Sequence, residues 1–199
     1  YWIKSNMEER LSFIEEAEQP LAMHPKKFAL WLFIVSVVMV FAGMTSAYIV
    51  RQGEGNWLEF DLPNVFWYTS GIIILSSMTL QWAYSAAKKD NFNKLKIGLL
   101  ATTVLGISFL VGQWFSWEAL VAEDVYFVGN PSGSFMYVFT GLHAIHLISG
   151  VIFLIFVLIS ALRNRIHSQK LAQLEMCLTY WHFLGGLWLY LFMFLLLNH

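Results

Sequence analysis

Charged residues are scarce in this chain of 199 residues. Asp, Glu, Lys and Arg make up only 13% of it, whereas a soluble domain carries roughly 25%. Hydrophobic residues make up 58%, so a water-soluble globule is excluded. The formal net charge is only -1, which lacks the basic excess that nucleic-acid binding requires. We therefore expect no nucleic-acid partner.

Cysteine is nearly absent as well. The single residue of this type, Cys177, cannot form a disulfide within the chain, and cysteine and histidine spacings typical of zinc fingers or iron–sulfur clusters do not occur. We therefore expect no thiol chemistry and no metal site built on cysteine.

Long apolar runs dominate what is present. Five of them exceed the roughly 18 residues that predict a membrane-spanning helix. They lie at about 27–50, 65–87, 95–117, 134–162 and 174–197. A lipid-embedded helix satisfies its own backbone hydrogen bonds, and the runs lack the alternation of barrel strands. The sequence predicts an all-α integral membrane protein, with a cytoplasmic amphipathic segment at 1–26 and a five-helix membrane domain at 27–199.

Basic residues are unevenly distributed between the predicted loops. Arg51 alone falls on one side of the membrane. The residues on the other side are Lys4, Arg10, Lys26, Lys27, Lys88, Lys89, Lys94, Lys96, Arg163, Arg165 and Lys170. Because Lys and Arg stay preferentially on the cytoplasmic side during insertion, this distribution predicts an N-terminus inside and a C-terminus outside.

Ionisable side chains are missing from the middle of the predicted spans, three histidines excepted. Glu175 lies at the start of the last span, and every Asp, Lys and Arg lies in a loop or at a span boundary. Proton pumps and ion-coupled transporters place such groups within the membrane. We therefore expect neither ion coupling nor a catalytic residue in this chain.

The three histidines lie on the last two spans. His143 and His146 share one face of the fourth span, and Glu175, Thr179 and His182 form a stripe on the fifth. His146 and His182 both lie roughly 12 Å from the inner surface, given a rise of about 1.5 Å per residue. The imidazoles have three interpretations. His146 and His182 are the two ligands of a haem, all three histidines form a metal site, or the polar rings form hydrogen bonds between packed helices. The lack of a nearby carboxylate or thiolate favours the last interpretation.

Two short motifs occur in order on these spans. Residues 142–150 read Leu-His-Ala-Ile-His-Leu-Ile-Ser-Gly, and Glu175 is followed by Tyr-Trp-His-Phe at 180–183 and by Trp188. Leu-Gly at 105–106 and Gln113 precede them. From about residue 27 to its end, the chain resembles subunit III of the haem–copper oxidases.

The resemblance implies an all-helical accessory subunit without its own redox cofactor. Haem and copper are expected in partner subunits, with direct contact to catalytic subunit I, neighbouring subunit II and other respiratory-complex subunits, and with bound phospholipid. The helical stripe adds Thr179 to the residues that the resemblance implies for a structural, lipid-contact or subunit-contact network. The candidate network is His143, His146, Glu175, Thr179, Trp181 and His182.

The chain also departs from the family pattern. Longer members have seven helices, of which the first two form one wall of a lipid cleft, whereas five are predicted here. A buried glutamate of many members is matched by Val37, and an aspartate that often follows the last motif is matched by Gly185. Because these departures remove carboxylates that family members carry, they favour a structural role for this chain in its complex.

The sequence thus predicts a non-catalytic, multi-pass subunit III of a bacterial cytochrome c oxidase in the plasma membrane, active in aerobic respiration through its complex. Two alternatives stay open. One is the equivalent subunit of a quinol oxidase or a nitric oxide reductase, because nothing in the residues selects the electron donor. The other is a membrane cytochrome b with two histidine ligands.

Overall fold

The computed structural model describes residues 25–58, 62–163 and 171–198, and this part of the chain folds into five α-helices. They are α2 (Pro25–Gly53), α3 (Val65–Lys88), α4 (Phe92–Ala122), α5 (Pro131–Leu162) and α6 (Ala172–Asn198). Each predicted span falls within one helix, so the all-α prediction is confirmed. The amphipathic segment predicted at 1–26 lies outside the described residues, except for the first two residues of α2.

Four of these described helices are long and apolar enough to cross a membrane, namely α2, α4, α5 and α6. The helix α3 has 24 residues, which is also long enough, but serines, threonines and Gln81 make it more polar. The chain is therefore a multi-pass membrane protein, and the crossing by α3 stays a prediction.

Asparagine side chains fix where two helices begin. The Asn91 side chain accepts a hydrogen bond from the backbone N–H of Lys94 at 3.3 Å, and that of Asn130 accepts one from Ser132 at 2.9 Å. Pro131 occupies the first turn of α5, where its missing N–H costs no helical hydrogen bond. Capping thus starts α4 and α5 three residues before the apolar runs that predicted them.

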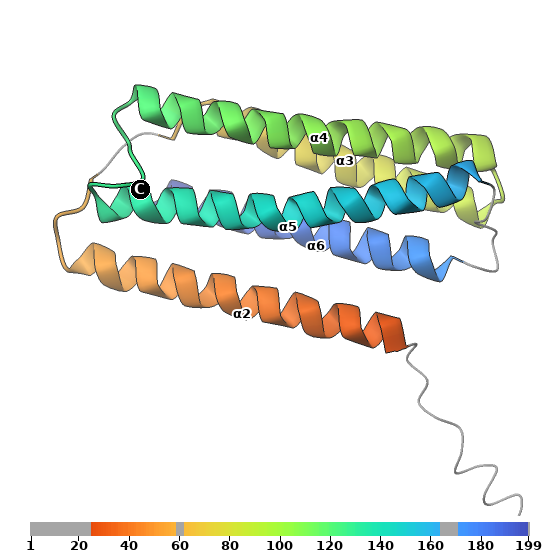
Figure 1. Ribbon diagram of the computed structural model, residues 1–199, viewed down its shortest axis with the longest axis horizontal. Helices are drawn as coiled ribbons and strands as arrows, with labels where there is room; N and C mark the ends of the chain where they lie inside the picture. Colours follow the sequence, from red (N-terminus) through yellow and green to blue (C-terminus); the bar gives the residue numbers. More distant parts are fainter. Residues whose placement is uncertain (1–24, 59–61, 164–170, 199) are drawn as a thin grey trace, which may run out of the picture.

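The helices form a bundle of four with a fifth at its side. Figure 1 shows α3, α4, α5 and α6 running alongside one another, with α2 along one flank. Among the described helices, α2 packs only on α5 and α6. The buried residues of α2 recur at helical spacing, and they are Ile34, Val37, Phe41, Thr45 and Tyr48. One narrow face therefore joins α2 to the bundle.

Small residues bring α3 and α4 close together. A Cβ added at Gly98 would lie 2.7 Å from the Cβ of Ala83, so only glycine fits there. The hydroxyl groups of Thr79 and Thr102 lie 2.8 Å apart across the same interface. Such close approach, with hydroxyl groups bonding between helices, is typical of helix packing in membranes.

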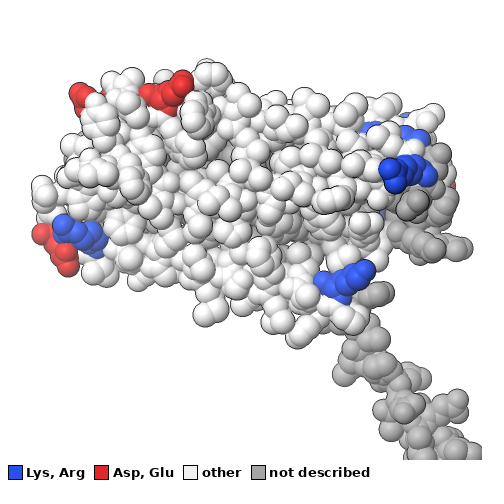
Figure 2. Space-filling model, viewed as in Figure 1, with Lys and Arg blue, Asp and Glu red and all other residues white. Residues whose placement is uncertain are grey.

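Charges gather at the two ends of the bundle. Figure 2 shows Lys and Arg at the end where α2 begins, Asp and Glu at the opposite end together with one basic patch, and an uncharged surface between. Arg51 and Glu54 pair at 2.8 Å at the end of α2. The uncharged band is the surface that a bilayer core would contact.

Candidate functional site

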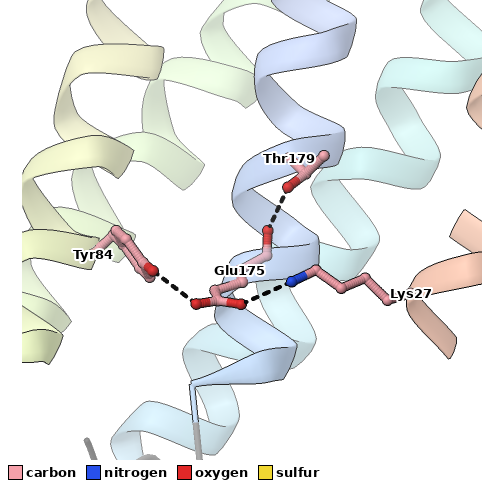
Figure 3. Close-up of polar contacts among 4 residues, drawn as sticks. All are labelled: Lys27, Tyr84, Glu175 and Thr179. Carbon is pink, nitrogen blue, oxygen red and sulfur yellow. Dashed lines mark hydrogen bonds and ion pairs between the residues drawn. The ribbon is translucent and has the colours of Figure 1, made fainter. Parts of the chain in front are cut away.

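Glu175 joins three helices at the basic end of the bundle (Figure 3). It lies in the first turn of α6. One carboxylate oxygen accepts a hydrogen bond from the Tyr84 hydroxyl of α3 at 2.8 Å, and the other lies 3.2 Å from the Lys27 Nζ of α2. The Thr179 hydroxyl donates to the backbone carbonyl of Glu175 at 2.9 Å. Glu175 thereby links α2 to α3, which do not pack on each other directly.

This cluster is partly open to its surroundings. The side chains of Lys27 and Glu175 are 44% and 36% exposed, so their ion pair contributes about 0–1 kcal/mol, as exposed pairs do. The Nζ of Lys88 lies 4.6 Å from the centre of the Tyr84 ring, which adds a cation–π contact. The cluster orients helix ends, and its stabilising effect is small.

Two tryptophans of α6 anchor that helix to α3. The indole nitrogen of Trp181 donates to the Ser76 hydroxyl at 3.0 Å, and that of Trp188 donates to the Ser70 hydroxyl at 3.0 Å. Each serine hydroxyl donates in turn to a backbone carbonyl of α3. Both indoles are buried. The two bonds fix the register of α6 against α3.

Glycines of two further helices let the core side chains of α6 pack closely, Gly106 beside Trp181 and Gly150 beside Leu184. A Cβ added at Gly106 of α4 would lie 2.6 Å from the Trp181 ring, and one at Gly150 of α5 would lie 3.5 Å from it. The same added atom at Gly150 would lie 2.7 Å from Leu184. Trp181 therefore occupies the centre of the four-helix bundle, in contact with α3, α4 and α5.

His143 is fully buried in the same core. Its ring lies 6.0 Å from that of Phe109 and 5.2 Å from that of Trp188, measured between centroids. Neither ring nitrogen has a hydrogen-bond partner in the described part of the chain. The sequence predicted that His143 forms hydrogen bonds between packed helices, and the structure places its ring among aromatic rings.

His146 and His182 have different neighbours. The Nδ1 of His146 lies 2.7 Å from the carbonyl of Leu142 in its own helix, and the ring lies 5.9 Å from that of Phe41 in α2. His182 is exposed, and its Nε2 lies 3.4 Å from the Gln81 side-chain oxygen of α3. The stripe on α6 thus divides, with Glu175 and Thr179 in contact and His182 facing Gln81.

The structure shows no common site for the three imidazoles. Of these three, His182 alone forms a hydrogen bond to a side chain of another helix in the part of the chain that the structure describes. Within residues 25–58, 62–163 and 171–198, no group of three or more His, Cys, Asp or Glu is placed to hold a metal ion.

Sequence reasoning missed the partners of Glu175 and of the tryptophans. Lys27 and Glu175 both begin spans that start on the same predicted side of the membrane, so their opposite charges were a signal for pairing. Ser70 and Ser76 offered no comparable signal, because serine in a membrane helix is equally typical of close packing.

Comparison with known proteins identifies a family that matches most of this chain. The family described as "Cytochrome c oxidase subunit III" matches residues 58–198. A "Probable cytochrome c oxidase subunit 3" of Nocardia farcinica is 30% identical over 167 residues, 81% of this chain and 82% of that protein. The "Cytochrome c oxidase subunit 3" of Corynebacterium diphtheriae is 28% identical, again over 81% and 82% of the two chains.

A mammal also carries a similar protein. The "Cytochrome c oxidase subunit 3" of Rattus norvegicus is 27% identical over 192 residues, 87% of this chain and 69% of the rat protein. The family match includes α3, α4, α5 and α6, and with them Glu175, both anchoring tryptophans and all three histidines. Since that match covers well over half of its residues, the chain belongs to the cytochrome c oxidase subunit III family.

Proposed function

We propose that this chain is a non-catalytic accessory subunit III of a bacterial haem–copper terminal oxidase, a cytochrome c oxidase of the plasma membrane. The family match over residues 58–198 carries the proposal. The relatives from two bacteria support a bacterial oxidase. Haem and copper belong to partner subunits in this proposal. The chain packs directly on subunit I, beside subunit II and other respiratory-complex subunits, and stabilises and protects it.

The distribution of polar groups supports a scaffold. The described Asp, Glu, Lys and Arg residues lie near helix ends or in loops, whereas pumps and transporters place them within the membrane. The centre of the bundle is filled by Trp181 and Trp188, which bond to serines of α3. Such a core holds one arrangement of helices for a partner to pack against.

The basic end of the bundle supports an orientation with the N-terminus inside and the C-terminus outside. Single cysteines at Lys89 and Glu123, which are exposed at opposite ends, test it with a membrane-impermeant maleimide on intact cells. We expect labelling of Glu123→Cys and not of Lys89→Cys. The natural Cys177 is buried and serves as the unlabelled background. Labelling of Lys89→Cys and not of Glu123→Cys would show the opposite orientation.

A groove between α2 and the start of α5 supports binding of a phospholipid. It has a volume of about 820 Å³, and its lining includes the ion pair of Arg51 and Glu54. Gly43 and Phe135 also line an adjoining apolar cavity of about 470 Å³. Arg51 suits a phosphate, Glu54 suits an ethanolamine amine, and the apolar cavity suits an acyl chain.

Native mass spectrometry of the purified assembly tests the lipid proposal. We expect retained phosphatidylethanolamine on the unmodified chain and less of it on Arg51→Ala. Arg163→Ala is the control, because Arg163 is an exposed basic residue at the opposite end of the bundle. Equal retention in the two variants would exclude the groove at Arg51 as the site.

Mass spectrometry of the assembly that co-purifies with the tagged chain tests the accessory role. We expect a haem-containing subunit I and a copper-binding subunit II. A quinol oxidase or a nitric oxide reductase would be identified by its own catalytic subunit. An absorption spectrum of the isolated chain provides the second test, because stoichiometric haem bound there would favour the cytochrome b alternative and overturn the proposal.

A further inference from the structure

Two polar side chains in the bundle core lack partners. Gln113 of α4 is 1% exposed and His143 of α5 is 0% exposed. Both amide atoms of Gln113 and both ring nitrogens of His143 have no hydrogen-bond partner in the described chain. Buried polar atoms are almost always bonded to protein or to ordered water. Four such atoms on neighbouring helices therefore point to a shared partner.

Two contacts fix how α4 and α5 are aligned. The indole nitrogen of Trp117 donates to the Thr140 hydroxyl at 3.0 Å, and a Cβ at Gly106 would lie 3.3 Å from Val151. Eleven residues separate Gly106 from Trp117, and eleven separate Thr140 from Val151. The two helices thus run antiparallel in one constant register between these contacts.

That register places Gln113 and His143 at nearly the same level. Gln113 lies four residues before Trp117, and its counterpart four residues after Thr140 is Ala144, the neighbour of His143. One residue corresponds to about 1.5 Å along a helix. Gln113 also shares a face with Phe109, four residues away, whose ring contacts that of His143. Both side chains therefore border the same part of the core.

The chemistry of the two groups selects the partner. A neutral imidazole offers one donor and one acceptor, and an amide offers donors on its nitrogen and acceptor sites on its oxygen. A metal ion would need further ligands, and among the described residues no group of three or more His, Cys, Asp or Glu is placed to hold one. A small neutral molecule that both donates and accepts satisfies both groups.

We propose that an internal water molecule binds between Gln113 and His143 and bridges α4 to α5 beside Trp188. The water accepts from one side chain and donates to the other, so that each gains a hydrogen bond without moving either helix. Buried waters typically make about three such bonds. The bridge holds the register of α4 and α5 at a level where the surrounding side chains are aromatic.

A high-resolution cryo-EM map of the protein, purified from native membranes in whatever assembly it occurs, tests the proposal. We expect a water-sized peak within hydrogen-bond distance of both the Gln113 amide and a His143 ring nitrogen. A direct bond between the two side chains, a peak of metal or porphyrin character, or no peak at all would overturn it. The map needs no variant, so failure of a variant to fold does not affect it.

A double-mutant cycle gives a second measurement. Gln113→Leu and His143→Phe should each lower the thermal midpoint, because each leaves the other group and the water short of a partner. The thermal midpoint of the double variant should fall by less than the sum of the decreases in the two single variants. Gln113→Leu with His146→Phe is the matched control and should be additive, since His146 bonds to its own helix. Additive losses in the test pair would contradict a shared water.

Discussion

The indole nitrogen of Trp181 donates to the hydroxyl of Ser76 at 3.0 Å, joining two helices whose bonded residues lie 105 positions apart in the chain. The Ser76 hydroxyl donates onward to the carbonyl of Ile73 at 2.8 Å. Both side chains are buried. A tryptophan of the last motif is thus part of the core, and its polar atom is satisfied by a residue that the motif does not include.

Ser76→Ala should destabilise the bundle. It leaves the buried indole N–H of Trp181 without an acceptor, which costs about 1–3 kcal/mol. The measurement is the thermal unfolding midpoint in detergent. Ser36→Ala is the control, because Ser36 is exposed and, among the described residues, bonds only to the carbonyl of Phe33 in its own helix. Its effect should stay within about 0.5 kcal/mol. Equal effects would contradict an anchoring role for the Trp181 bond.

Gly106→Ala and Gly186→Ala should act in opposite directions. A Cβ at Gly106 would lie 2.6 Å from the Trp181 ring, so overpacking should cost about 1–3 kcal/mol. Nothing lies within 4 Å of a Cβ at Gly186, and there alanine should stabilise the helix by up to about 1 kcal/mol. Thermal midpoints of the two variants check this. A neutral Gly106→Ala would show that the Trp181 ring can shift.

Glu175→Gln should make the attachment of α2 less sensitive to salt. The ion pair with Lys27 is partly exposed, so its loss should cost only about 0–1 kcal/mol. The unmodified chain should lose stability as ionic strength rises, and the variant should lose less. Lys89→Gln is the control, because Lys89 is exposed at the same end of the bundle and forms no ion pair with another described residue, so its salt dependence should match that of the unmodified chain. An unchanged salt dependence in Glu175→Gln would exclude a contribution from this pair.

His182→Leu should change little in the chain itself. The side chain is exposed and its bond to Gln81 is long, at 3.4 Å, so the free energy of unfolding should shift by about 0.5 kcal/mol or less. The haem spectrum of the co-purified complex should stay the same. An altered spectrum would contradict this prediction and favour the cytochrome b alternative, in which His182 is a haem ligand.

The spans were predictable because they depend on local composition. Runs such as 134–162 are largely apolar, and lipid requires them to be helical whatever they contact. Helix ends were less predictable, since Asn91 and Asn130 begin α4 and α5 through single side-chain hydrogen bonds outside the apolar runs. A search for long apolar runs does not detect such caps.

The sequence by itself determined that the chain is a membrane protein, the five helices and the family, because composition and ordered motifs are properties of the chain alone. Only the tertiary structure decided the partners of each polar residue: Glu175 with Tyr84 and Lys27, Trp181 with Ser76, and His143 among aromatic rings. The reason is physical. Helices that are largely apolar give little sign of which face meets which neighbour, so contacts depend on packing and on where glycine permits close approach.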